Sequence, residues 1–124
     1  MAKFIAVQPV LSVRDVRKSA RWFCERLGFS PRFADNDEDP RYAGVVRDGV
    51  EVHLQWHGPD EWAAGLDAAA YRFVVDDPDA LHAEYAAAGV LPAGKVVEDT
   101  AWGTREFGLY DPDGNALFFY RDRA

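Results

Sequence analysis

The stretch VLSVRDVRKSARWFCERLGF, residues 10–29, decides the fold, because its pattern changes from strand to helix within a few residues. Its β-branched and apolar start continues an apolar run that begins at residue 4, which predicts a strand over 4–13. From Val16 onward the apolar side chains recur at helical spacing, and Gly28 is a typical helix end. The sequence therefore predicts a helix over 16–27 directly after this strand.

The second half of the chain repeats this order. The stretch YRFVVDDPDALHAEYAAAGV, residues 71–90, predicts a strand and then a helix that begins near Pro78 and ends at Gly89. In each half an Asp-Gly turn then opens a last strand, in RDGVEVHLQW (47–56) and in PDGNALFFYR (112–121). Both halves therefore carry the same sequence of signals.

The landmarks of the two halves keep nearly constant separations, which favours an internal duplication. The pairs Asp15 and Asp77, Gly28 and Gly89, and Gly49 and Gly114 are 62, 61 and 65 residues apart. Each half has room for two more strands between its helix and its last strand, so we predict an α+β fold of two βαβββ modules. Curved sheets of this kind enclose a cleft when they lie side by side. The expected boundaries within a single domain over 1–124 are module 1 at about 1–57, a linker at 58–69 and module 2 at about 70–124.

The composition narrows the class of partner. Lys and Arg number 14 against 21 Asp and Glu, and the formal net charge of −7 disfavours nucleic acid and anionic membranes while attracting cationic partners. Cys24 is the single cysteine, so no internal disulfide is possible and a reducing compartment is expected. The sequence has no apolar run long enough for a signal peptide or a membrane span. We therefore expect a cytoplasmic protein.

With these features the chain resembles the vicinal oxygen chelate superfamily, which contains glyoxalase I, extradiol dioxygenases, fosfomycin resistance enzymes and bleomycin resistance proteins. The two strand-helix stretches and the closing REFGLYDPDGNALFFY, residues 105–120, carry the resemblance over nearly the whole chain. In the enzymes four side chains hold a divalent metal, at the start of the first strand and on the last strand of each module. These positions correspond here to Gln8, His53, Ala70 and Phe118. Since Ala and Phe have no ligating atoms, the resemblance implies no metal site, no cofactor and no catalytic residue. His53 is then expected to be satisfied by a neighbour or by solvent.

Within that superfamily the chain most closely resembles the bleomycin resistance proteins, through VLSVRDV, LGFSPRF, YAGVVRDGV, AWGTREF and DPDGNALFF in the same order. This resemblance implies a homodimer that sequesters a drug without changing it and so confers resistance. Bleomycin-type drugs carry a flat bithiazole and a cationic tail, which suit exposed aromatic rings in an acidic groove.

Trp102 is the best candidate for a stacking side chain, because it stands between Ala101 and Gly103 in a loop-forming segment with little local reason to be buried. Phe33 and Tyr42 flank an acidic loop, where they contact ligand or cover the sheet edge. Side chains alternate along a strand, so one of Phe118 and Phe119 faces the cleft. The predicted ligand-binding residues are Phe33, Tyr42, Asp60, Trp102, Gly103 and Phe118. Arg105 would repel a cationic ligand and is assigned to a structural ion pair.

Two other functions fit the sequence. One is a metal-dependent enzyme of the same superfamily, such as a glyoxalase-like lyase or a dioxygenase, whose ligands lie at other positions. The other is a domain that binds an unrelated small molecule. Bound divalent metal separates the enzyme from the binding protein.

Overall fold

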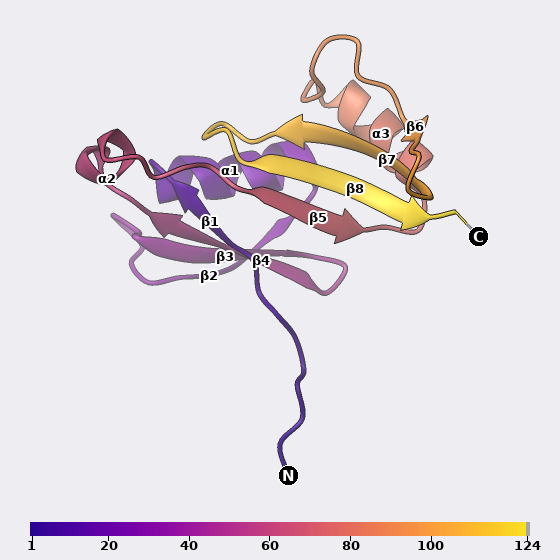
Figure 1. The fold of residues 1–124 in the computed structure, drawn as a ribbon. Helices are drawn as coiled ribbons and strands as arrows, with labels where there is room; N and C mark the ends of the chain where they lie inside the picture. The colour runs from indigo at the N-terminus through magenta and orange to yellow at the C-terminus, as the bar shows by residue number, and fades with distance from the viewer. Residues whose placement is uncertain (124) are drawn as a thin grey trace.

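The structure is a computed structural model that describes residues 1–123, and it contains the two predicted modules (Figure 1). The elements of the first module are β1 (Val10–Val13), α1 (Val16–Leu27), β2 (Ser30–Ala34), β3 (Tyr42–Arg47) and β4 (Val50–Trp56). The elements of the second are β5 (Ala70–Val74), α3 (Pro78–Ala87), β6 (Glu98–Asp99), β7 (Thr104–Tyr110) and β8 (Ala116–Asp122). Both predicted helices and both predicted last strands are confirmed within a few residues.

Each module forms its own 4-stranded mixed sheet, and the two sheets have the same topology. Sheet A has the order β1-β4-β3-β2, and sheet B has the order β5-β8-β7-β6. In each sheet the first strand of the module runs parallel to the last one, while the remaining pairs are antiparallel. The matching order supports the internal duplication that the sequence landmarks predict.

Two of the three landmark pairs lie at helix ends, and the third, Gly49 and Gly114, lies in the turns before the last strands. Asp15 and Asp77 are N-caps whose carboxylates accept hydrogen bonds at 3.0 Å from the backbone N–H groups of Lys18 and Ala80. Gly28 ends α1 with φ of 78°, a left-handed conformation that glycine adopts without steric cost. The two halves therefore share residue types at positions where a helix end requires a capping carboxylate or a glycine.

One core joins the two modules, and it determines which sheet faces stay open. Leu54 of β4 and Phe23 of α1 belong to the same buried cluster as Phe119 of β8 and Tyr85 of α3. The Tyr85 hydroxyl also donates to the backbone carbonyl of Leu27 at 2.9 Å. Since the helix-covered faces of both sheets pack into this cluster, their opposite faces lie on the outside of the chain.

The structure corrects the sequence prediction at two places. Only Val10–Val13 of the predicted strand over 4–13 pairs with a neighbour, and the preceding residues form an extended arm that projects from the body (Figure 1). A strand needs an edge to pair with, and residues 4–9 pair with none among the described residues. The linker at 58–69 also contains a short helix, α2 (Pro59–Ala63), which begins at a proline. No helix within residues 1–123 has both the length and the apolar character of a membrane span.

Candidate functional site

The open face of sheet A carries an aromatic surface made by two of the predicted residues. Phe33 of β2 stacks on Tyr42 of β3, with ring centroids 6.1 Å apart and an interplanar angle of 19°. Phe33 lies flat because Gly44, its neighbour in the sheet, has no side chain: a Cβ there would stand 2.4 Å from the Phe33 ring. Phe33 remains 41% exposed, so a flat surface faces solvent.

His53 of β4 lies beneath this surface and has partners at both ring nitrogens. The Tyr42 hydroxyl lies 2.7 Å from Nδ1, and a carboxylate oxygen of Glu51 lies 2.6 Å from Nε2. Phe33 meets the imidazole edge-on, with centroids 5.2 Å apart. The expectation that neighbours satisfy His53 is confirmed.

The open face of sheet B presents a second aromatic surface. Phe118 and Tyr120 point to this face, while Phe119, only 3% exposed, points into the core. The guanidinium carbon of Arg72 lies 4.3 Å from the Tyr120 ring centroid and 5.8 Å from that of Phe118. Gly108 lies beside Phe118 in the register, and a Cβ there would approach that ring to 2.9 Å. Each module therefore has an aromatic ring lying over a strand glycine.

A buried carboxylate lies beside the aromatic surface of sheet B. Glu106 of β7 accepts hydrogen bonds from Arg72 at 3.0 Å and from the Thr104 hydroxyl at 2.6 Å. The bond from Arg72, followed by that from Thr104, lowers the pKa of Glu106 below its ordinary value, although burial acts in the opposite direction. The carboxylate is therefore held ionised and fixes the orientation of Arg72.

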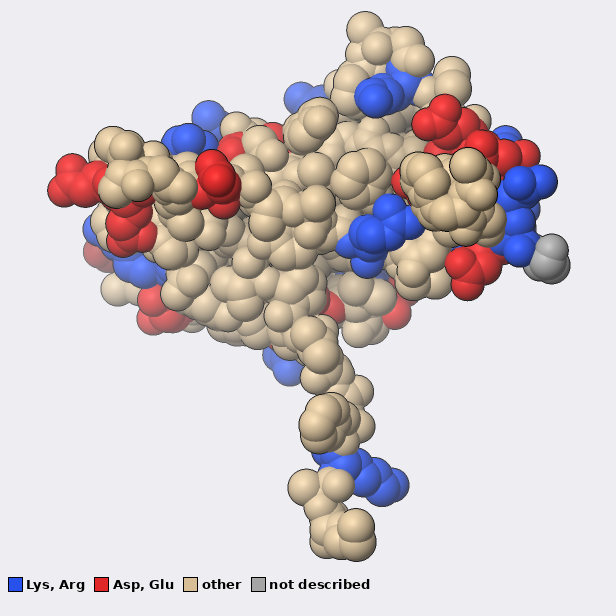
Figure 2. Space-filling view, viewed as in Figure 1, with Lys and Arg blue, Asp and Glu red and all other residues tan. Residues whose placement is uncertain are grey.

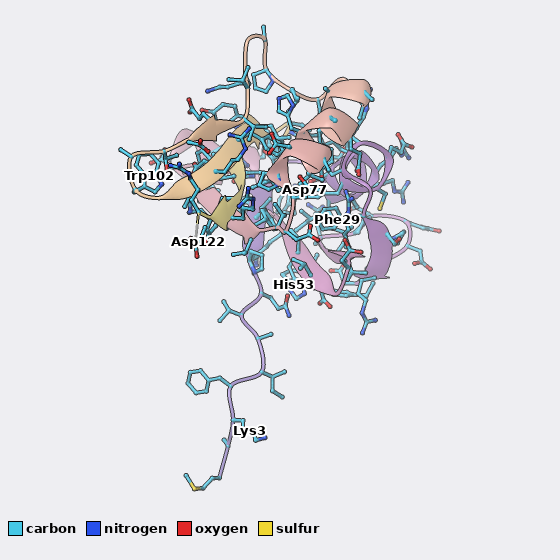
Figure 3. The ribbon with its side chains drawn as sticks, turned by 90° about the vertical axis from the view of Figure 1, so that its right-hand side faces the viewer. Lys3, Phe29, His53, Asp77, Trp102 and Asp122 are labelled. Atoms are coloured by element: carbon cyan, nitrogen blue, oxygen red, sulfur yellow. The ribbon has the colours of Figure 1, made fainter. Side chains whose placement is uncertain are left out.

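Trp102 lies in the turn between β6 and β7 and is 68% exposed, as its sequence context predicts (Figure 3). Gly103, with φ of 89°, follows it and lines an open pocket together with Asp99, Arg105, Arg121 and Arg123. Arg105 contacts Asp79 at 2.7 Å and Asp99 at 3.0 Å, which confirms its assignment to structural ion pairs.

Two other acidic segments are α2 and the loop that joins the strands of Phe33 and Tyr42. Asp60 is exposed in the first turn of α2 and makes no side-chain hydrogen bond or ion pair with any residue in the described part of the chain. In the loop at 34–42, the Asp35 carboxylate accepts from the backbone N–H groups of Arg41 and Tyr42, and the guanidinium of Arg17 donates to loop carbonyls. The acidic loop is therefore held by its own Asp35 and by Arg17 of α1.

The four positions implied by the superfamily do not offer the donor set of a metal site. His53 and Phe118 occupy matching places on the last strands, opposite Gly44 and Gly108. Gln8 lies in the exposed arm, and Ala70 and Phe118 present hydrocarbon. Among residues 1–123 no group of three His, Cys, Asp or Glu side chains is arranged to hold a metal ion. The residues present therefore do not fit the metal of the superfamily enzymes.

The predicted residues divide into two sets on different parts of the molecule. Phe33 and Tyr42 contact each other on sheet A, whereas Phe118 lies in β8 of sheet B and Trp102 lies in the turn between β6 and β7. No hydrogen bond or ring contact among residues 1–123 joins the two sets. Arg72 and Glu106 were not among the residues predicted from the sequence to bind ligand. The signal that could have indicated Arg72 is its place as the one charged residue in the apolar strand YRFVV.

Comparisons with known proteins are consistent with this architecture. The sequence pattern of the Glyoxalase/Bleomycin resistance protein/Dioxygenase superfamily matches residues 5–119. A bleomycin resistance protein of Geobacillus stearothermophilus is 29% identical over 128 aligned positions, covering 91% of this chain and 93% of the relative.

Solved structures give the same picture. The bleomycin-binding protein from bleomycin-producing Streptomyces verticillus, complexed with copper(II)-bleomycin, is 33% identical with a TM-score of 0.77, covering 99% of this chain and 100% of the other. A bleomycin-binding protein complexed with bleomycin is 23% identical with a TM-score of 0.75, covering 97% and 100%. That second likeness concerns the fold alone.

Proposed function

The chain belongs to the Glyoxalase/Bleomycin resistance protein/Dioxygenase superfamily, and from this premise we propose that it sequesters a planar, cationic antibiotic of the bleomycin class, or a similar metabolite, without changing it. The observation that carries the proposal is the pair of open aromatic surfaces, one on each sheet. Rings held flat over strand glycines suit stacking with a planar guest. The relatives named for bleomycin resistance and bleomycin binding support the identity of that guest.

The proposal includes a homodimer, because one chain does not bring the two aromatic surfaces together. A second copy would place its sheet B opposite sheet A of the first, so that Phe33 and Tyr42 face Phe118 and Trp102 across a cleft. The exposed arm supports this pairing, since Phe4 and Ile5 project from the chain almost fully exposed. In this arrangement each dimer has two equivalent clefts.

The proposal also holds that the protein is not an enzyme and that it acts in the cytoplasm. The donor set at Gln8, His53, Ala70 and Phe118 supports the absence of metal chemistry, because two of these residues cannot ligate. A cytoplasmic site of action agrees with Cys24, a cysteine without a disulfide partner.

Titration calorimetry with metal-free and with copper-loaded bleomycin tests the function. We expect a saturable isotherm with one site per chain for at least one form of the drug, and unchanged drug in the mixture afterwards. Absence of binding to both forms would refute the proposal. Elemental analysis of the purified protein provides a second test: near-stoichiometric divalent metal, with turnover that chelation abolishes, would establish the enzyme instead.

A further inference from the structure

We infer that Glu51 and His53 orient the hydroxyl of Tyr42 so that its oxygen is a hydrogen-bond acceptor for an N–H group of the ligand. The inference rests on the proposed function and adds a polar specificity element to the aromatic surface of sheet A. Tyr42 is the contact residue, while Glu51 and His53 are positioning residues.

The direction of the hydrogen bonds that link Glu51, His53 and Tyr42 follows from which of their atoms can donate a proton. Glu51 places one carboxylate oxygen 3.6 Å from Nε of Arg32 and the other 2.6 Å from Nε2 of His53. An ionised carboxylate only accepts hydrogen bonds, so Nε2 carries the proton. In the neutral ring Nδ1 is then an acceptor, and the Tyr42 hydroxyl 2.7 Å away must donate to it.

The phenolic oxygen is therefore left with lone pairs and no proton to offer. Its hydroxyl makes no hydrogen bond with the described residues other than the one to His53. Tyr42 is partly exposed beside the exposed ring of Phe33, whereas the imidazole is covered by the rings of both residues. A ligand that stacks on Phe33 meets the Tyr42 oxygen, and His53 stays underneath.

This arrangement selects a chemical class of ligand. A protonated amine or an amide N–H next to a flat ring satisfies the acceptor, whereas a carbonyl or carboxylate at that place faces an oxygen that has no hydrogen to donate. The site therefore favours planar ligands that carry donors, in agreement with the acidic net charge of the chain.

The tautomer of His53 is tested on the ligand-free protein by ¹⁵N NMR of the histidine side chains at pH 8. The inference requires a ring protonated at Nε2 alone, and it predicts a larger share of the Nδ1-protonated form in Glu51→Gln, because an amide side chain can donate to Nε2 as well as accept from it. A ring protonated at Nδ1, or at both nitrogens, in the unsubstituted protein would overturn the inference. Since no ligand is needed, this result is independent of whether the protein binds bleomycin.

A double-mutant cycle with metal-free bleomycin tests the effect on binding. Tyr42→Phe should weaken binding by about tenfold, the scale of a hydrogen bond to a charged donor. Glu51→Gln should weaken it by about three- to tenfold in the unsubstituted protein but by less than about twofold when Tyr42→Phe is present, because Glu51 acts through the hydroxyl. Equal effects of Glu51→Gln in both backgrounds would show that the carboxylate attracts the ligand directly and would overturn the inference, as would full affinity of Tyr42→Phe.

Glu61→Gln is the matched control. Glu61 contacts His57 at the start of α2, so this variant removes the same charge from another His-Glu pair outside sheet A. Its affinity should stay within about twofold of the unsubstituted protein. If the unsubstituted protein binds no bleomycin, the proposed function fails, while the NMR result still decides the orientation of Tyr42.

Discussion

Trp102 is the most exposed of the aromatic residues assigned to the binding surfaces. Its Ala variant should keep the fold and weaken bleomycin binding by about 1–3 kcal/mol, because the lost indole is a stacking anchor. Titration calorimetry measures the change. Trp102→Phe should recover part of the affinity, and Trp22→Phe, on α1 away from the open faces, should leave it unchanged. Full affinity of Trp102→Ala would remove this side chain from the site.

Glu106 should link stability to pH. Its pKa is lowered by the hydrogen bond from Arg72, so the folded state binds its proton less readily than the unfolded chain. The stabilisation is therefore present above the ordinary pKa of a glutamate and is lost as the pH falls through the lower folded value. Thermal unfolding of the Glu106→Gln variant between pH 7 and pH 3 should show a shallower loss of stability in acid. An unchanged slope would mean that the ion pair contributes nothing.

Asp111 should act in the opposite direction. Burial raises its pKa, although hydrogen bonds from Asn115 partly offset the shift. A raised acid pKa means that this group favours the folded state more as the pH falls toward the ordinary aspartate value. The change in stability of the unsubstituted protein in acid therefore combines a loss from carboxylates with a lowered pKa, such as Glu106, and a gain from Asp111. The Glu106→Gln variant removes the contribution of Glu106 alone.

Part of the site was predictable at the scale of single residues. Strand alternation predicted that one of Phe118 and Phe119 faces outward, and loop composition predicted the exposure of Trp102; both are local properties. The contacts of Tyr42 with His53 and of Arg72 with Glu106 join different strands. They depend on strand register, which no local pattern specifies, and so the sequence analysis missed them.

At the scale of the strands, a glycine in β3 controls the binding surface of sheet A. Gly44 has extended backbone that alanine can adopt, but an added Cβ would stand 2.4 Å from the Phe33 ring. Because Phe33 is partly exposed, its ring can swing outward and the fold should survive. We expect Gly44→Ala to weaken bleomycin binding by about tenfold, through loss of a stacking surface worth about 1 kcal/mol or more.

The double variant Phe33→Ala/Gly44→Ala is the control for this effect. Without the ring, the added methyl group displaces nothing, so the Gly44 substitution should have no further effect on affinity. Circular dichroism and the unfolding temperature confirm that each variant folds. A Gly44→Ala protein with full affinity would show that the flat orientation of Phe33 is irrelevant to binding.

The elements were predictable where their ends have chemical signals. Asp15 and Asp77 cap helices, and Gly28 ends one, because helix ends leave backbone groups that only certain residues satisfy. The short β6 lacks such signals, and α2 has a proline at its start but is only 5 residues long. Residues 4–9 carry a strand pattern but pair with no strand among the described residues, and a strand pattern does not specify a partner edge.

At the scale of the whole molecule, the arm before β1 carries the most exposed large apolar side chains of the described residues. Phe4, Ile5 and Val7 are 103%, 95% and 89% exposed, and Figure 2 shows the arm as largely uncharged apart from one basic side chain. Burying side chains of this kind contributes about 1.5–3 kcal/mol each. The arm also extends β1, an edge strand, so its backbone groups are free to pair with another copy.

Deletion of residues 2–8 should therefore raise the dimer dissociation constant by at least about a hundredfold, measured by sedimentation velocity over a range of concentrations. Ile5→Glu should have a smaller effect in the same direction, and Lys3→Gln, which changes the charged residue of the arm, should have almost none. If the cleft forms between two copies, bleomycin affinity should fall together with dimerisation, and excess drug should restore the dimer by mass action. A shortened chain that is monomeric and binds with full affinity would place the whole site within one chain, and an unsubstituted protein that is monomeric at every concentration would exclude the shared cleft.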